Sequence, residues 1–499
     1  MFDPLLHALP YVFQPANLFA MVAGVVLGIA IGALPGLSAT MGIAVLIPLT
    51  FGLDPLVGLG MMAGIYNGAM YGGAIPAVLL RIPGTPASIV TTFDGYPMAQ
   101  KGEAGRALQI AVVSSAIGGM VSAVVLMTLA PPLARVTLAF GPAEYFWVGI
   151  FGLSAIAVFV GKNPIKGVLS ACIGLLIGCI GIDTITGAQR FTFGNINLYD
   201  GFNIVVLLTG LYAIPPAIAM AEEAVKTGIS RDKLRVKSSH GMFDDWRRLW
   251  KTWTRSSVIG VIVGLLPGAG GNIAAFLSYN EAKRASKTPD EFGEGSPEGV
   301  AAGECGNNAD NSAALVPALT LGVPGSSVAA VILGGLLIHG LRPGPALFRD
   351  YPDVVYGFMI QMFVTSALLM FIGGIIGTRV FIHVLRLPRV LLVPLIAGLT
   401  AVGVYSINNS MFDLYMMLGF GLLGYAMERL DFPLAPAVLG LILGPMAEEN
   451  MRLALLISQN DWLVFVTRPI SVTIAVLTLL VLAFPIIRDM IARRRTAPA

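Results

Sequence analysis

The chain has 499 residues, of which 56% are hydrophobic and 12% charged, with a net charge of +3 and a mean hydropathy of +0.80. Soluble domains carry about 25% charged residues, so this chain lacks the polar surface that a soluble protein of its length needs. The composition argues against a soluble enzyme, a nucleic-acid-binding protein and a disordered scaffold. It predicts an all-α polytopic membrane protein.

Apolar segments follow one another along the whole sequence, at about 18–53, 55–80, 107–138, 143–160, 164–182, 202–221, 256–279, 301–338, 354–385, 388–405, 411–427, 433–446 and 462–487. A single crossing needs about 20 apolar residues, so we expect about 10 to 12 transmembrane helices with additional re-entrant pieces. Several segments are too long for one crossing or are cut by Pro-Gly steps.

Basic residues are distributed unevenly. Residues 1–80 contain no Lys or Arg, whereas residues 223–255 contain nine and the C-terminal tail adds Arg488 and Arg493 to Arg495. The positive-inside tendency places the central loop and the C-terminus in the cytoplasm and the N-terminus outside. We therefore divide the chain into a first transmembrane region (1–222), a basic cytoplasmic loop (223–255) and a second transmembrane region (256–499).

The two transmembrane regions contain the same motifs in the same order. Gly28-x3-Gly32-x-Leu34-Pro35-Gly36 returns 232 positions later as Gly260-x3-Gly264-x-Leu266-Pro267-Gly268. Pro76-x3-Leu80-x-Ile82-Pro83-Gly84-Thr85 returns 241 positions later as Pro317-x3-Leu321-x-Val323-Pro324-Gly325-Ser326, and Asn67 pairs with Asn308 at that same spacing. A charged insertion around 281–298 accounts for the difference between the two spacings, 232 and 241 positions. This pattern predicts an internal duplication.

The charge map indicates how the two repeats are oriented. Repeat one enters the membrane from the side of the uncharged N-terminus, and repeat two enters from the basic loop. The repeats are then inverted, which is the arrangement that supports alternating access in secondary transporters.

Each repeat contains two Pro-Gly steps, for which we expect broken helices and re-entrant hairpins: Pro35-Gly36, Pro83-Gly84, Pro267-Gly268 and Pro324-Gly325. Proline ends a helix, and glycine permits positive φ and close approach of a ligand. A half-helix that starts after such a step presents free amides and its positive dipole end, which suits a carboxylate. The alternative is an ordinary external turn. We expect the substrate to be bound by Gly84, Thr85, Ser88, Gly325, Ser326 and Ser327.

A polar cluster precedes the second step of each repeat. Residues 304–312 read Glu-Cys-Gly-Asn-Asn-Ala-Asp-Asn-Ser, and residues 66–73 form the counterpart in repeat one. Buried polar groups at membrane depth are costly and usually line a pathway or a cation site, although residues 304–312 could instead lie at the water interface. We expect Asn67, Asn308 and Asp310 to bind a coupling cation such as Na⁺, with Asp310 as an alternative proton carrier.

Motifs for other chemistries are absent from the sequence. There is no GxxxxGK[ST], nucleophile elbow or HExxH, and the four histidines do not cluster. We therefore expect no enzyme activity, no cofactor, no metal beyond a possible Na⁺ and no binding of nucleic acid. The coupling ion, Na⁺ or H⁺, stays open at this point.

The motifs resemble those of the large membrane subunit of tripartite tricarboxylate transporters (TctA-like). The matching stretches are Gly32-Ala-Leu-Pro-Gly-Leu-Ser38, Gly64-Ile-Tyr-Asn-Gly-Ala-Met-Tyr-Gly-Gly73, Ile82-Pro-Gly-Thr-Pro-Ala-Ser88, Asp94-Gly-Tyr-Pro-Met-Ala99, Gly264-Leu-Leu-Pro-Gly-Ala-Gly270 and Gly322-Val-Pro-Gly-Ser-Ser327. Asn is frequent in that family where this sequence has Arg81, which argues against Arg81 as an indispensable substrate ligand.

The resemblance implies a multi-pass subunit of the bacterial inner membrane that imports citrate-like carboxylates with an ion gradient. It also implies two partners, a small membrane subunit (TctB-like) and a periplasmic solute-binding protein (TctC-like). The alternatives are an anion channel and a membrane-embedded enzyme that modifies lipid.

Overall fold

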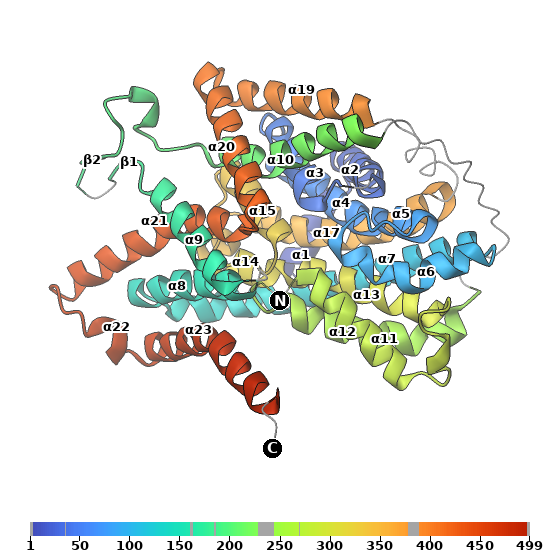
Figure 1. Ribbon diagram of the computed structural model, residues 1–499. Helices are drawn as coiled ribbons and strands as arrows, with labels where there is room; N and C mark the ends of the chain where they lie inside the picture. The colour runs from blue at the N-terminus through green and yellow to red at the C-terminus, as the bar shows by residue number, and fades with distance from the viewer. Residues whose placement is uncertain are drawn as a thin grey trace.

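The computed structural model describes residues 3–34, 36–159, 163–183, 186–227, 244–268, 270–377 and 389–496. The middle of the basic loop (228–243), including Arg231, Lys233, Arg235 and Lys237, and the helix-break residue Pro35 lie outside the described residues. Figure 1 shows a predominantly helical molecule, and its described strands form one short antiparallel pair, β1 (Gly181–Ile182) with β2 (Gln189–Arg190).

The first half of the chain contains α1 (Asp3–Val12), α2 (Pro15–Ala33), α3 (Ala39–Thr50), α4 (Pro55–Gly72), α5 (Ala74–Leu80), the 3₁₀ helix η1 (Pro86–Ile89), α6 (Thr91–Gln100), α7 (Ala104–Val136), η2 (Thr137–Ala139), α8 (Pro142–Phe159), α9 (Pro164–Gly178), η3 (Ile196–Leu198) and α10 (Ile204–Thr227). The second half begins with α11 (Trp246–Gly264), α12 (Gly270–Ala285), η4 (Pro289–Glu291), α13 (Pro297–Ala313), α14 (Leu315–Leu321), α15 (Ser327–Ile338), α16 (Pro345–Asp350) and α17 (Pro352–Phe371). It continues with a π-helical turn, η5 (Ile372–Gly377), α19 (Arg389–Asn408), α20 (Met411–Arg429), α21 (Leu434–Ile457), α22 (Val464–Thr467) and α23 (Pro469–Thr496).

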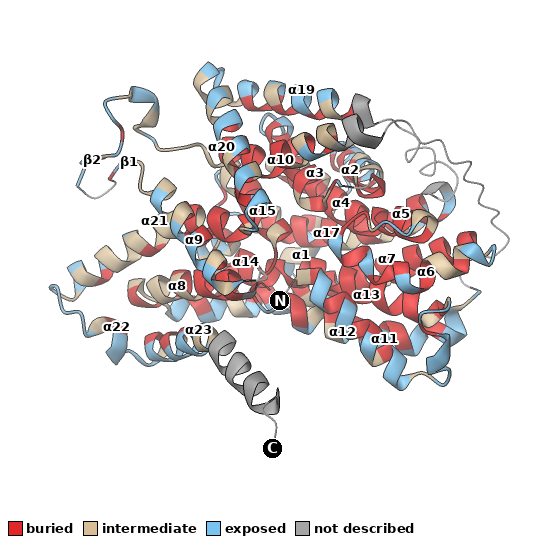
Figure 2. Ribbon diagram, viewed as in Figure 1, coloured by how far each residue is buried: buried red, intermediate tan, exposed pale blue. Residues whose placement is uncertain are grey.

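The helices have the composition of a membrane protein. Within the described ranges, four are long and apolar enough to cross a bilayer: Pro15–Ala33, Ala104–Ala139, Ile204–Glu222 and Pro352–Ile375. Shorter apolar helices accompany them, and large apolar side chains such as Phe19, Leu422 and Leu479 point outward. Figure 2 shows buried residues concentrated at the centre of the molecule. The prediction of an all-α polytopic membrane protein is therefore confirmed.

The Pro-Gly steps lie between helices. Pro83-Gly84 separates α5 from η1, Pro267-Gly268 separates α11 from α12, and Pro324-Gly325 separates α14 from α15. At the remaining step, Gly36 lies between α2 and α3. Gly36 and Gly268 adopt φ of +93° and +82°, a conformation that glycine accepts without steric cost.

Small residues bring two pairs of helices into backbone contact. A methyl group at Gly28 of α2 would lie 2.5 Å from the carbonyl oxygen of Ile65 in α4, and one at Gly264 of α11 would lie 2.8 Å from that of Asp310 in α13. Gly32 packs against Ala69 and Gly260 against Gly306 in the same way. The contacts thus recur at the spacing of the sequence motifs, and they show why small residues occupy these positions.

The segments that end in the second Pro-Gly step of each half also match. The Gly84 amide donates to the Gly73 carbonyl at 3.2 Å, and the Gly325 amide donates to the Ala314 carbonyl at 3.1 Å. Arg81 ends α5 with φ of 58°, and the corresponding Gly322 ends α14 with φ of 74°. The exposed Arg81 side chain stacks over Tyr96, with 5.7 Å from its guanidinium carbon to the ring centroid.

Candidate functional site

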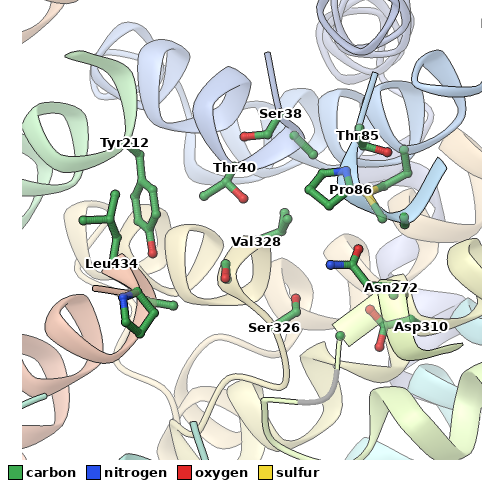
Figure 3. A pocket seen from close by; sticks show the side chains of 18 of the residues that line it. Ser38, Thr40, Thr85, Pro86, Tyr212, Asn272, Asp310, Ser326, Val328 and Leu434 are labelled. Atoms are coloured by element: carbon green, nitrogen blue, oxygen red, sulfur yellow. The ribbon is translucent and has the colours of Figure 1, made fainter. Parts of the chain in front are cut away.

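A cavity of about 380 Å³ lies where these two segments meet. Thr85 reaches it from the first half of the chain, and Ser326 and Ser327 reach it from the second half. Figure 3 shows Thr85 and Ser326 on opposite sides of the same space, with Ser38 and Thr40 above and Asp310 below. Residues separated by about 240 positions therefore line one site.

Four elements begin at the wall of this cavity. They are α3 at Ser38 to Thr40, η1 at Thr85 and Pro86, α12 at Gly270 to Asn272, and α15 at Ser326 and Ser327. Ser38 and Ser326 cap their helices, accepting hydrogen bonds from Met41 and Ala329 at 3.1 and 3.2 Å. The first amides of a helix have no partner within the helix, so several such starts around one space favour an anion.

Not all of the predicted substrate residues reach the cavity. Ser88 is fully buried, and its hydroxyl is 2.7 Å from that of Thr85 instead of facing the open space. The amides of Gly84 and Gly325 already donate to the carbonyls of Gly73 and Ala314 within their own segments. The geometry therefore leaves Thr85, Ser326 and Ser327 as the members of the predicted set that line the cavity.

The charged side chains at the cavity are acidic. Among the described residues that line it, Asp310 and Glu428 carry carboxyl groups, and none is Lys or Arg. Neither oxygen of the buried Asp310 carboxyl has a hydrogen-bond partner of regular geometry, although the carboxyl faces the amide of Gly271. A carboxylate in this environment is costly unless a cation, a proton or water compensates it.

The predicted cation ligands separate into two groups. Asn67 and Asn308 lie in one buried cluster, because the side-chain amide of Asn311 donates to the side-chain oxygen of Asn67 at 3.1 Å and to that of Asn308 at 3.4 Å. The Asn67 amide in turn donates to the Thr365 hydroxyl at 2.9 Å. Asp310 lies on a different face of α13 and lines the cavity.

A second buried carboxyl lies on α13, away from the cavity. Glu304 is 1% exposed, and it accepts hydrogen bonds from the hydroxyls of Thr91 in α6 and Ser115 in α7. Both oxygens of this carboxyl are therefore satisfied. They connect α13 to two helices of the first half of the chain.

Sequence reasoning did not identify Asp94 as a connecting residue. Its carboxylate accepts hydrogen bonds from the Gly293, Gly295 and Ser296 amides at 2.8–2.9 Å and from the Tyr279 hydroxyl at 2.9 Å. This ties α6 to the segment between α12 and α13. In the sequence, the sign of this role was that Asp94 is a lone acidic residue inside one of the motif stretches.

Sequence reasoning also did not identify Tyr66 of α4 as a cavity residue. Its hydroxyl lies 3.5 Å from that of Ser326.

A helical membrane protein whose interrupted helices surround a cavity lined by hydroxyl and carboxyl groups among apolar side chains has the architecture of a membrane transporter. Residues 18–439 match the sequence model of the tripartite tricarboxylate transporter TctA family. The chain belongs to this family, as its motifs predicted, and it is a multi-pass membrane subunit of a tricarboxylate transporter that works with other subunits.

Two relatives come from Agrobacterium vitis. The chain is 38% identical over 464 residues to an uncharacterized 52.8 kDa protein in the TAR-I ttuC' 3' region, covering 92% of this chain and 91% of that protein. It is also 38% identical over 236 residues to an uncharacterized protein in the TAR-II ttuC' 3' region, covering 47% of this chain and 97% of that protein. No solved structure matches the chain.

Proposed function

We propose that this chain is the transport subunit of a cation-coupled importer of citrate-like carboxylates in the bacterial inner membrane. The single observation that carries the proposal is the cavity shared by Thr85 and Ser326, around which four elements begin. Helix starts and hydroxyls suit a carboxylate, and the hydroxyls come from both motif-bearing halves of the chain.

The two halves are proposed to be inverted repeats that move relative to each other during alternating access. Support comes from the recurring contacts of α2 with α4 and of α11 with α13. These glycine-lined contacts make each pair a candidate rigid unit. Such a unit would carry its own tip, Thr85 in one half and Ser326 in the other, to a shared substrate.

The coupling cation is proposed to bind beside the substrate. The substrate adds negative charge to a cavity whose described lining holds two carboxyl groups and no basic side chain. A cation at Asp310 would reduce repulsion between this carboxyl and the substrate, so each ligand would favour binding of the other. Asn67 and Asn308 would then shape the buried wall behind the site.

The proposed assembly contains a small membrane subunit and a periplasmic solute-binding protein that delivers the carboxylate. The tripartite nature of the family supports this arrangement. In it, the present chain forms the path through the bilayer and the other subunits determine delivery.

Uptake is expected to run on an ion gradient without ATP. The test is reconstitution of the full-length chain with its partner subunits in liposomes that carry an imposed Na⁺ or H⁺ gradient. Citrate is the first substrate to measure, with tricarballylate and tartrate beside it. Uptake above the external concentration supports the proposal. Equilibration without accumulation would indicate a channel, and strict dependence on ATP would contradict the proposal.

Loss of a single cavity hydroxyl is expected to weaken apparent substrate affinity. Thr85→Val and Ser327→Ala each remove one hydrogen-bonding group, worth about 0.5–1.5 kcal/mol, or roughly a few-fold to tenfold in KM. Ser326→Ala should also lower stability by about 1 kcal/mol, because Ser326 caps α15. Uptake kinetics check the changes in KM, with Thr473→Val on α23 as the matched control. An unchanged KM in both Thr85→Val and Ser327→Ala would place the substrate elsewhere.

A further inference from the structure

Buried side-chain atoms without a hydrogen-bond partner occur along α13 at Asn307, Asp310, Asn311 and Ser312, and Asn307 and Asp310 contribute most of them. Asn307 is 1% exposed, yet neither its side-chain oxygen nor its side-chain nitrogen has a hydrogen-bond partner. Both oxygens of Asp310 are also without a regular partner. Buried polar atoms in folded proteins are nearly always paired with protein, water or an ion, so several unpartnered atoms together mark a candidate site for a polar ligand.

Asn307 and Asp310 point toward the same region. They are three residues apart in a helix, which places their side chains on one face about 5–6 Å apart at Cβ. Both adjoin the first turn of α12: the Asp310 carboxyl faces the amide of Gly271, and a methyl group at Gly271 would clash with the Asn307 oxygen. Gly271 and Asp310 line the cavity, so Asn307 lies immediately behind its wall.

The neighbouring face of α13 differs in this respect. There the side-chain oxygens of Asn67 and Asn308 both accept from the Asn311 amide, which occupies the position that a cation would need. The amide of Asn308 donates to the Glu304 carbonyl at 3.0 Å. In this cluster the Asn311 oxygen is left without a partner, whereas neither polar side-chain atom of Asn307 and neither oxygen of Asp310 has one.

We propose that Asn307 and Asp310 form a Na⁺ site between α12 and α13, directly behind the substrate cavity. Carboxylate and amide oxygens are hard ligands that suit such a cation. An amide oxygen can coordinate a metal ion but does not serve as a proton carrier at physiological pH, so the pairing of Asn307 with Asp310 favours Na⁺ over H⁺. One cation neutralises the Asp310 carboxylate, so this group no longer repels a substrate carboxylate in the adjacent cavity.

The site predicts Na⁺ binding in the absence of substrate. With purified full-length protein in detergent, NaCl should raise the thermal unfolding temperature relative to equal concentrations of KCl or choline chloride. Asn307→Ala and Asp310→Asn should each lose this difference. Asn450→Ala, in which the truncated amide belongs to α21 and does not line the cavity, should retain it.

A second test measures Na⁺-dependent transport. It rests on the proposed function and is separate from the binding measurement. In proteoliposomes, Asn307→Ala should raise the Na⁺ concentration for half-maximal citrate uptake about tenfold or more, and Asn450→Ala should leave it unchanged. If Asn307→Ala fails to fold, Asn307→Asp supplies a folded test, because its extra carboxylate should change Na⁺ affinity while retaining side-chain size.

Three outcomes would overturn this inference while leaving carboxylate transport intact. They are H⁺-driven uptake with no effect of Na⁺, equal stabilisation of the wild type by Na⁺ and K⁺, and a Na⁺ response lost in Asn308→Ala but retained in Asn307→Ala. The proposed function fails by a different result, namely the absence of carboxylate accumulation under every imposed ion gradient.

Discussion

Gly325→Ala and Gly84→Ala are each expected to abolish carboxylate uptake. A methyl group at Gly325 would lie 2.6 Å from the Gly264 carbonyl oxygen and 2.9 Å from the Ala314 Cα. At Gly84 it would clash with the Gly32 carbonyl and lie 2.7 Å from the Gly73 Cα. These neighbours are backbone atoms that cannot rotate away, so the segment itself must shift.

The shift would act directly on the site, because Thr85 and Ser326 each follow the substituted glycine. Overpacking of this kind costs about 1–3 kcal/mol and moves the backbone. A displacement near 1 Å can cost roughly a hundredfold in the function of a positioned group. Uptake assays, with surface expression measured alongside, check this expectation.

Gly419→Ala is the matched control for both variants. Gly419 lies in α20, and an added methyl group there meets no described atom within 4 Å. This variant should transport normally and should gain slightly in helix stability. Wild-type transport by Gly325→Ala and Gly84→Ala would show that these segments tolerate movement and are not the substrate-binding tips.

Asp94→Ala is expected to destabilise the whole protein. The change removes the acceptor for three backbone amides and the Tyr279 hydroxyl, all in the segment from α12 to the start of α13. Each buried donor left unpaired costs about 1–3 kcal/mol, and breaking such a network typically totals about 3–5 kcal/mol. Gly293 and Gly295, with φ of +96° and +107°, wrap the backbone around this carboxylate.

Three variants separate the loss of the Asp94 hydrogen bonds from the loss of side-chain volume. Tyr279→Phe removes one hydrogen bond and should cost about 1 kcal/mol. Asp94→Asn keeps one oxygen for the amides and should fall between Tyr279→Phe and Asp94→Ala. Thermal unfolding of the full chain in detergent measures all three. If Asp94→Ala were as stable as Tyr279→Phe, the amide contacts would contribute little to holding α6 against α13.

Local chemistry determined the features that were predictable from the sequence. Composition alone indicated a helical membrane protein, because lipid-embedded chains must satisfy their backbone groups internally. The Pro-Gly steps indicated where helices end, since proline lacks an amide hydrogen and glycine accepts positive φ. The motif spacing also anticipated that Thr85 and Ser326 occupy corresponding positions.

Tertiary structure decided which polar side chains meet. Asn307 and Asn308 are adjacent in the sequence, but a helix turns about 100° per residue, so they face different surroundings. Packing of α12 leaves Asn307 beside Asp310, whereas Asn308 joins Asn67 through Asn311. The contacts of Asp94 with a segment about 200 residues away likewise depend on how α6 packs against α13. The sequence could propose which residue types bind ions and carboxylates, but the helix faces that assemble around a cavity depend on long-range packing.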